Sequence, residues 1–351
     1  MVSELSGLER VLAALSLEEP DRVPTFEWSI NGRVRETLFP GSSPFGFADK
    51  AGLDGVVVYE DQQKENTGSH GYRDEWGITY AETEEDYPTA VGHPLESFDG
   101  QAEDIAVSLT IPDPQADWRF ESLREAVKRF KGRKAIVFRL RDAFSLPRNL
   151  RGMQNLMIDF VLNPDLVRQL TDISIDFNIK TAYRAMELGA DIFWTSDDYC
   201  DNRGPTMGPE IWREFILPGL RRLVQTIRKE GYHFIKHNDG NIRSILPEMA
   251  DTGISCIDPI DTGAGMDLAE TKQNFGSRLA IKGGFPAEPV LCRGAREDVE
   301  EEVKRCLKAA AYGGGYILST SSDIISSVKP ENYLAMLEAN RKYGTYPLRL
   351  D

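Results

Sequence analysis

The sequence is poor in cysteine and histidine, with four of each among 351 residues. The cysteines are widely scattered, at Cys200, Cys256, Cys292 and Cys306. Because they form no CxxC pair, we expect the reduced thiols of a cytoplasmic protein rather than a disulfide framework. No run of about 18 uncharged apolar residues occurs, so no membrane-spanning helix is expected. The opening residues MVSELSGLERVLAAL lack a basic start, and Glu9 and Arg10 interrupt their apolar pattern, so we expect no signal peptide.

Positive charge is scarce relative to negative charge. The chain has 41 lysines and arginines against 56 aspartates and glutamates, so its formal net charge at pH 7 is −15. Binding to a nucleic-acid backbone or to an anionic membrane needs a basic surface, so we expect neither partner. A hydrophobic content of 41% is enough for a folded globular chain and too high for a disordered one.

The sequence also lacks internal repeats, low-complexity segments and a GxGxxG turn after its first strand pattern. Short apolar strand patterns instead alternate with longer helical patterns. The eight expected strands are Arg22–Phe26, Val56–Tyr59, Ala135–Leu140, Asp191–Thr195, Tyr232–Lys236, Ile254–Ile257, Arg278–Ile281 and Gly315–Leu318. Such an alternation forms right-handed βαβ units, and eight units close a (β/α)8 TIM barrel of α/β class. An open doubly wound sheet is the alternative, which the missing glycine-rich turn weakens.

We expect residues 1–351 to form a single barrel domain with two additions. A helical pattern from Leu8 to Leu15 predicts a helix before the first strand. Between Gly68 and Pro94 the chain is polar and aromatic and breaks the strand–helix rhythm. This hairpin-like stretch predicts an insertion, at about residues 61–117, after the second strand.

Active sites of such barrels lie at the carboxyl ends of the strands. The polar or aromatic residues that follow the expected strands include Glu27, Trp28, Glu60, Arg141, Asp142, Asp197, Asp198, His237, Asp239, Asp258, Ser322 and Asp323. Any single acid could cap the next helix. Together, however, they place many carboxylates at one rim, and their repulsion requires a cation, a metal or shared protons.

His237 is the most informative histidine because Asn-Asp-Gly-Asn follows it directly. His237 and Asp239 are two residues apart, so in extended chain both can point to one side. An imidazole and a carboxylate placed in this way can hold a metal ion. Two other interpretations stay open: Asp239 orients a neutral His237, or residues 239–241 form only a turn. His233 lies four residues earlier, but inside a strand this spacing does not create a shared helical face.

Seven stretches of the chain carry a family resemblance. They are ERVLAALSLEEPDRVP at 9–24, DEWGITY at 74–80, SDDYCDNRGPTMGPEIWREFILP at 196–218, KHNDGNI at 236–242, IKGGFPAEPVLCRGA at 281–295, GGGYILSTSSDI at 313–324 and KPENYLAMLEANRKYG at 329–344. With them the chain resembles the uroporphyrinogen decarboxylase superfamily, and within it the branch of corrinoid-dependent methyltransferases. The resemblance covers nearly the whole chain and implies a (β/α)8 barrel.

The resemblance does not extend to the decarboxylase substrate. True uroporphyrinogen decarboxylases carry an arginine-rich segment after the first strand, which holds the acidic side chains of the porphyrinogen. Here residues 28–35 read WSINGRVR, so that motif is missing. A rim this acidic is also a poor host for a polycarboxylate. We therefore expect no porphyrinogen decarboxylation.

The thiol-methylating members of the family bind zinc through a His-x-Cys pair and a later cysteine. Here Asp239 stands in place of the first cysteine, and Ser322 stands near the place of the second. The resemblance thus implies a site of nitrogen and oxygen ligands at His237 and Asp239, with zinc as the candidate metal. Such a site is a harder Lewis acid and suits the polarisation of an ether oxygen. Members with a His-x-Asp-Gly-Asn motif are similar to O-demethylases that feed a corrinoid protein.

Our leading hypothesis is a methyltransferase of O-demethylase type, which moves a methyl group from a small methoxylated substrate to the cobalt of a partner corrinoid-binding protein. No Asp-x-His-x-x-Gly segment for cobalamin occurs, so the corrinoid would arrive on that partner. The expected catalytic residues are His237, Asp239, Glu27, Asp197 and Asp198, and either Asp239 or Glu27 could serve as general acid. The expected substrate contacts are Phe26, Trp28, Tyr59, Phe285, Arg141, Asp142, Arg203 and Ser322, with Arg141 or Arg203 on a donor carboxylate.

Three other functions stay open at this point. The first is methyl transfer in the opposite direction, from a methylated corrinoid to a small acceptor. The second is a decarboxylase or lyase that acts on a small carboxylic acid and protonates the product from a rim acid. The third is a barrel that binds a ligand without catalysis.

Overall fold

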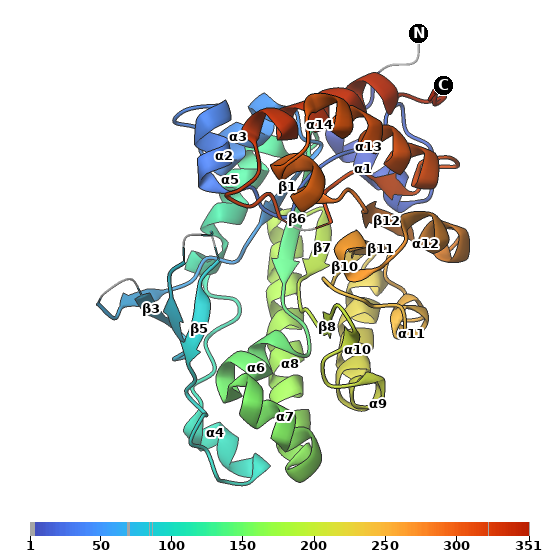
Figure 1. The fold of residues 1–351 in the computed structure, drawn as a ribbon. Helices are drawn as coiled ribbons and strands as arrows, with labels where there is room; N and C mark the ends of the chain where they lie inside the picture. Colours follow the sequence, from blue (N-terminus) through green and yellow to red (C-terminus); the bar gives the residue numbers. More distant parts are fainter. Residues whose placement is uncertain (1–3, 69–70, 84, 86, 322, 351) are drawn as a thin grey trace.

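The computed structural model describes residues 4–68, 71–83, 85, 87–321 and 323–350, and its centre is a curled parallel sheet (Figure 1). The seven strands of this sheet lie in the order β1-β6-β7-β10-β11-β12-β13, which is also their order along the chain. They are β1 (Gly55–Val58), β6 (Ala135–Leu140), β7 (Ile192–Thr195), β10 (His233–His237), β11 (Cys256–Ile260), β12 (Ala280–Gly283) and β13 (Tyr316–Ile317). The order never reverses, as in a barrel and unlike a doubly wound sheet.

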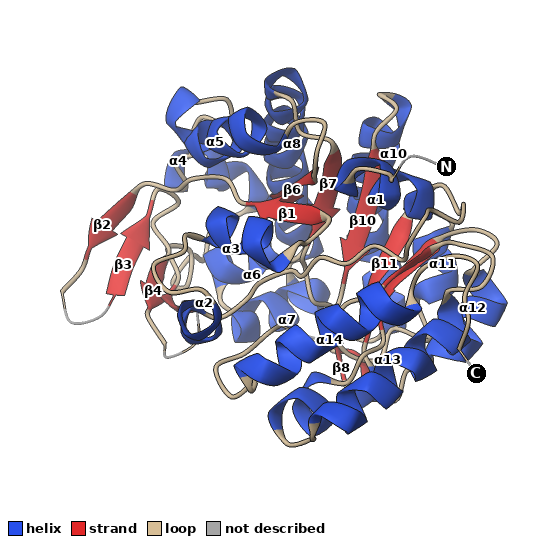
Figure 2. Ribbon diagram, turned by 90° about the horizontal axis from the view of Figure 1, so that it is seen from above, coloured by secondary structure: helices blue, strands red, loops and turns tan. Residues whose placement is uncertain are grey.

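Helices surround this sheet (Figure 2). The α-helices are α1 (Gly7–Leu15), α2 (Gly32–Leu38), α3 (Pro44–Ala51), α4 (Ile105–Ser108), α5 (Glu121–Phe130), α6 (Ser145–Arg151), α7 (Met153–Leu162), α8 (Pro164–Leu188), α9 (Pro209–Ile211), α10 (Leu217–Lys229), α11 (Leu246–Ala250), α12 (Leu268–Phe275), α13 (Arg296–Ala310) and α14 (Pro330–Tyr343). The 3-10 helices are η1 (Ala102–Asp104), η2 (Asp117–Phe120) and η4 (Thr262–Ala264), and the π-helical segments are η3 (Trp212–Ile216) and η5 (Ala287–Cys292). The alternation of strands and helices predicted from the sequence is confirmed.

The first predicted strand, Arg22–Phe26, is not a regular strand. Thr25 makes a single parallel bridge to Leu318, and the backbone N–H of Leu318 donates to the carbonyl of Pro24 at 3.0 Å. On the other side, the N–H of Asp54 donates to the carbonyl of Thr25 at 2.8 Å. The segment thus joins the region of β13 to the start of β1 through isolated bonds. Pro24 has no N–H to donate, which limits a continuous ladder here.

The inward face of the sheet follows the two-residue period of each strand. Alternate residues that meet in one buried cluster are Ala135 and Val137 of β6, Ile192 and Trp194 of β7, Ile235 of β10, Cys256 of β11, Ala280 of β12 and Ile317 of β13. The same period places the next inward side chains, among them Arg139, His237 and Asp258, toward the carboxyl ends of the strands. An apolar layer therefore fills the amino-terminal half of the sheet, and a polar layer lies above it.

Helix α1, which confirms the predicted amino-terminal helix, packs against this apolar layer. Ser6 caps the helix, because its hydroxyl accepts from the N–H of Glu9 while the Glu9 carboxylate accepts from the N–H of Ser6. Val11 and Ala14 join the cluster inside the sheet. Gly7 packs closely against the backbone of Asp54, because a Cβ at Gly7 would be 2.6 Å from the Asp54 carbonyl oxygen. The helix thus covers the amino-terminal end of the sheet and leaves the carboxyl ends open.

The segment predicted as a hairpin forms a four-stranded antiparallel sheet. Its strands are β2 (Lys64–Asn66), β3 (Gly71–Asp74), β4 (Thr79–Ala81) and β5 (Thr89–Gly92). Its Tyr80 hydroxyl accepts from Asn149 of α6 at 3.4 Å, and Nδ1 of His93 lies 2.8 Å from the Asn149 carbonyl oxygen. The small sheet extends beyond the carboxyl ends of the parallel strands, to their left in Figure 1. A two-stranded ribbon, β8 (Cys200–Asp201) with β9 (Gly204–Pro205), lies beyond β7.

All four cysteines are free. Within the described residues, none of the helices has both the length and the apolar composition needed to cross a membrane.

Candidate active site

A cavity of about 1120 Å³ opens between the carboxyl ends of the parallel strands and the small antiparallel sheet. Its lining includes Glu27, Trp28, Tyr59, Arg139, Arg141, Arg148, Asp198, His237, Asp239 and Asp323. Aromatic rings from the small sheet, including Tyr72 and Tyr80, line the same space. The cavity therefore brings together several of the predicted site residues. It also contains Arg139 and Arg148, which were not predicted, beside the predicted Arg141.

His237 is held from two directions. Its Nδ1 lies 2.8 Å from Oδ2 of Asp258, its register partner on β11. The ring of Trp28 stacks on the imidazole, with ring centroids 4.9 Å apart and an angle of 20° between the planes. The second oxygen of Asp258 accepts from Lys282 at 2.8 Å. Because Asp258 fixes Nδ1, the imidazole presents Nε2 toward the other carboxylates.

Asp198, His237 and Asp239 form a group that could hold a metal ion. One ligand atom of each lies within 4.8 Å of the other two. Nε2 of His237 is 3.6 Å from Oδ1 of Asp198 and 3.8 Å from Oδ2 of Asp239. Oδ1 of Asp239 is buried and has no hydrogen-bond partner among the described residues. Nitrogen and oxygen donors with an unsatisfied carboxylate atom fit zinc or another divalent cation.

The local backbone positions these ligands. Asp198 follows β7, and its Oδ1 accepts from the N–H of Asp239 at 2.9 Å. Gly240 has a positive φ of 89°, and a Cβ there would lie 2.8 Å from the carbonyl oxygen of Asp201. Only glycine fits this turn without strain. The His-x-Asp-Gly pattern thus combines two candidate ligands with the turn that folds them against the neighbouring loop.

Electrostatics in this group favour a cation. Burial disfavours a charged imidazole, but the charge and hydrogen bonding of Asp239 and Asp258 outweigh burial and raise the pKa of His237 to about 10. Burial raises the pKa of Asp239, as does the charge of Asp198. Burial and Asp239 likewise raise the pKa of Asp323 to about 7. A metal ion bound here would replace protons as the compensating positive charge.

Glu27 lies on the cavity wall and is only 6% exposed. Its Oε2 accepts from the hydroxyl of Thr320 at 3.1 Å, whereas its Oε1 has no hydrogen-bond partner among the described residues. Burial raises the pKa of Glu27 from 4.5 to about 8, against the opposing effect of Lys282. Glu27 is therefore mostly protonated at neutral pH, as a general acid must be.

We expect the Glu27→Gln variant to show this proton as a pH effect on stability. Between pH 4.5 and 8 the folded protein holds a proton on Glu27 that the unfolded chain does not, so its free energy of unfolding falls as the pH rises. Relative to Glu27→Gln, wild type should lose about 2 kcal/mol between pH 5.5 and 7.5. Urea unfolding of both proteins across this range measures the difference. Parallel stability curves would contradict the raised pKa.

Asp197 and Asp142 form a separate buried network. Oδ2 of Asp197 accepts from the N–H groups of Phe144 and Ser145, at 2.8 and 2.7 Å. Lys236 lies 3.1 Å from Asp142. Although burial opposes it, Lys236 lowers the pKa of Asp197 to about 2, whereas burial and the charge of Asp197 raise the pKa of Asp142 to about 7. These contacts hold the loops after β6 and β7 together, and neither carboxylate is among the cavity-lining residues.

Three other predicted substrate contacts lie away from the cavity lining. Phe26 is fully buried, with its ring edge against Trp194, and Phe285 is buried in the core between the sheet and its helices. Arg203 is 91% exposed and pairs with Asp201 at 2.9 Å. The structure thus places these three in packing or at the surface. Ser322 lies outside the described residues.

A family model for uroporphyrinogen decarboxylase (URO-D) matches residues 77–343. A curled parallel sheet with ionisable side chains at its carboxyl ends is the arrangement of a TIM-type enzyme. The chain belongs to the uroporphyrinogen decarboxylase family.

Relatives in this family include methyltransferases. The chain is 25% identical to methylcobamide:CoM methyltransferase MtaA of Methanosarcina barkeri over 208 residues, which cover 59% of this chain and 58% of that protein. It is 23% identical to methylcobamide:CoM methyltransferase MtbA of Methanosarcina mazei, over 97% of this chain and 99% of that protein. The match to MtaA thus spans little more than half of that protein's length.

A solved structure of a methyltransferase from Methanosarcina mazei has the same fold. It superposes with a TM-score of 0.75 at 20% identity, and the match covers 97% of this chain and 99% of that chain. This likeness confirms the TIM-type fold expected from the sequence. The chain is therefore homologous to corrinoid-related methyltransferases as an enzyme of the uroporphyrinogen decarboxylase family.

Proposed function

We propose that this enzyme transfers a methyl group between a corrinoid carried by a separate protein and a small molecule bound in the cavity. The observation that carries the proposal is the group of Asp198, His237 and Asp239, which faces the cavity at the carboxyl ends of the strands. The similarity of the chain to methylcobamide:CoM methyltransferases supports methyl transfer at this site. The open end of the sheet is the side from which a corrinoid protein would approach.

Asp198, His237 and Asp239 would hold a zinc ion. When bound, the ion would supply Lewis acidity to the sulfur or oxygen atom of the substrate. Asp258 keeps the imidazole oriented through Nδ1, and Trp28 covers one ring face. Glu27 and Asp323, with pKa values raised to about 8 and about 7 by burial, are placed on the cavity wall to give up or take up a proton.

The relatives favour transfer from the corrinoid to the small molecule. The names of MtaA and MtbA describe methylcobamide as the methyl donor and CoM as the acceptor. In that direction the acceptor loses its proton and bonds to the methyl carbon, while the electron pair of the cobalt–carbon bond stays on cobalt. O-demethylation, the direction expected from the sequence, stays the second candidate. The observation that favours it is the ligand group itself, which contains two aspartates and no thiolate.

Methyl transfer can be tested with methylcobalamin as the methyl donor. We expect the zinc-loaded protein to accelerate loss of the methyl group in the presence of CoM, with formation of the methyl thioether and cob(I)alamin. The absorbance of the corrinoid and mass spectrometry of the product measure the reaction. In a second arm, cob(I)alamin and a panel of methoxyarenes test the opposite direction.

The two arms separate the candidates. Reaction in the first arm supports transfer to an acceptor, and reaction only in the second supports O-demethylation. If neither arm reacts, and carbon dioxide is released from a small carboxylic acid without any corrinoid, methyl transfer is wrong and the lyase alternative holds. The His237→Gln variant in each arm controls for reaction away from the site.

A further inference from the structure

Three of the arginines in the lining of the active-site cavity come from the end of β6 and from α6. Arg139 and Arg141 are two residues apart at the end of β6, so both continue the inward face that begins with Ala135 and Val137. Arg148 comes from α6, one element further along the chain. All three belong to the cavity lining. The cavity that holds the candidate metal ligands therefore also contains a group of cations.

None of these arginines forms an ion pair with a carboxylate within the described part of the chain. Arg139 donates to the hydroxyl of Ser196 at 2.6 Å. Arg148 donates to the side-chain carbonyl of Asn149 at 3.2 Å. Both partners are neutral, so these hydrogen bonds bring no counterion to Arg139 or Arg148.

Carboxylates near Arg141 are engaged by other groups. Oε2 of Glu60 lies 3.2 Å from Arg119. Oδ1 of Asp74 accepts from the N–H groups of Trp76 and Ile78, at 3.0 and 2.9 Å. Burial lowers the pKa of Arg141, but Tyr80 and the charges of Asp197, Glu60 and Asp74 outweigh burial and raise it. These acids therefore compensate Arg141 in part, without forming an ion pair with it among the described residues.

Arg141 also repels the other two arginines electrostatically. Burial lowers the pKa of Arg139 and of Arg148, and in each case the charge of Arg141 lowers it further. Like charges that a fold holds together in a partly buried space are costly unless an anion neutralises them. Guanidinium groups are suited to this task because they bind carboxylates and other oxyanions through paired N–H donors.

We propose that Arg139, Arg141 and Arg148 bind an anionic group, a carboxylate or a sulfonate, at the end of the substrate remote from the reacting atom. The reacting atom then lies toward His237, an assignment that rests on the proposed function. Arg139 lies between the arginine end and the histidine end of the cavity. Its guanidinium is 4.7 Å from the ring of Trp28, which in turn stacks on His237. The substrate class is a short acid with a thiol or methoxy group at its other end.

Binding of paired probes tests this inference without any corrinoid. The anionic probes are 4-methoxybenzoate and 2-mercaptoethanesulfonate, and their neutral counterparts are 4-methoxybenzamide and 2-mercaptoethanol. Calorimetry with wild type should show tighter binding of at least one anionic probe than of its counterpart. In Arg141→Met the affinity for that probe should fall about tenfold or more, while the neutral counterpart is unaffected. Arg141→Lys should lie between the two.

Matched controls keep the result interpretable. Arg203→Met removes an exposed arginine outside the cavity and should leave binding unchanged. Arg148→Met provides a second cavity variant, and the unfolding temperature of each cavity variant shows whether it folds as wild type does. The benzoate and sulfonate arms show which anion the site takes.

Equal affinity for charged and neutral probes in wild type, or unchanged affinity in both cavity variants, would overturn the anion site. Failure of methyl transfer alone would leave these binding results standing and would overturn only the proposed reaction.

Discussion

Replacing His237 by glutamine should abolish high-affinity zinc binding and lower methyl transfer about 10³-fold, which corresponds to about 4 kcal/mol of lost transition-state stabilisation. The physical reason is the arrangement around its Nε2, which lies 3.6 Å from Asp198 and 3.8 Å from Asp239. Removing the imidazole leaves two carboxylates that repel each other and no nitrogen donor. Zinc content after dialysis and competition with a chromophoric chelator measure the loss of the metal.

The same strand offers a matched control. His233 lies at the other end of β10, where its Nδ1 is 3.0 Å from the hydroxyl of Ser255. His233→Gln should therefore keep zinc content and methyl transfer near those of wild type. A His237→Gln protein that retains stoichiometric zinc would show that His237 is not a zinc ligand. Retained zinc together with lost activity would instead assign His237 to proton transfer or substrate binding.

Two members of the candidate metal-binding group, His237 and Asp239, were predicted as ligands, and Asp198 was predicted only as a catalytic residue; all three follow strands closely. His237 is the last residue of β10, Asp239 is two residues beyond it, and Asp198 follows β7 in the same way. Strand-end position is readable from apolar runs, and parallel strands bring their carboxyl ends to one edge. The contact from Asp258 to Nδ1 was not predictable, because it depends on the register that pairs His237 with Asp258.

Only part of the arginine group could be predicted from the sequence. Arg141 directly follows β6 and could be predicted as a site residue from that position, whereas Arg139 lies inside the strand. The two-residue period could have found it, since Ala135, Val137 and Arg139 share one face. The position of Arg148 in the cavity could not be predicted, because it depends on how α6 packs over the sheet. The cavity lining thus combines the carboxylates expected at this rim with arginines, of which only Arg141 was among the predicted contacts.

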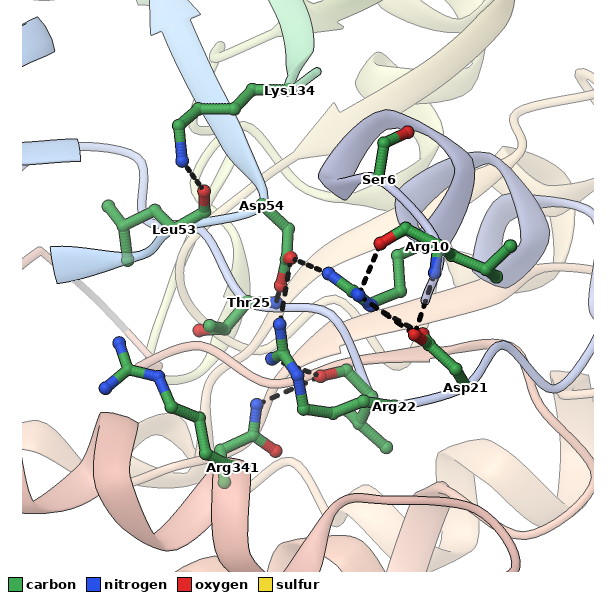
Figure 3. Close-up of polar contacts among 12 residues, drawn as sticks. Ser6, Arg10, Asp21, Arg22, Thr25, Leu53, Asp54, Lys134 and Arg341 are labelled. Atoms are coloured by element: carbon green, nitrogen blue, oxygen red, sulfur yellow. Dashed lines mark hydrogen bonds and ion pairs between the residues drawn. The ribbon is translucent and has the colours of Figure 1, made fainter. Parts of the chain in front are cut away.

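A buried ion-pair network lies at the opposite end of the sheet, around Asp54. Figure 3 shows Arg10 and Arg22 converging on this carboxylate. Oδ1 of Asp54 lies 2.8 Å from Arg10 and 3.1 Å from Arg22, and its Oδ2 accepts from the N–H of Thr25 at 2.9 Å. Asp54 is 2% exposed and ties α1, the irregular segment 22–26 and the start of β1 together.

The Asp54→Ala variant should therefore lose about 3–5 kcal/mol of unfolding free energy, because it leaves the buried charge of Arg10 with one partner fewer and orphans the N–H of Thr25. The remaining pair of Arg10 with Asp21, at 2.6 Å, limits the loss to this range. Asp172→Ala is the control, since Asp172 is exposed and lies 3.4 Å from Arg222, which is also exposed; its cost should stay below about 1 kcal/mol. Urea unfolding at neutral pH measures both. Equal losses in the two variants would mean that the Asp54 network stabilises the amino-terminal end of the sheet no more than a surface ion pair does.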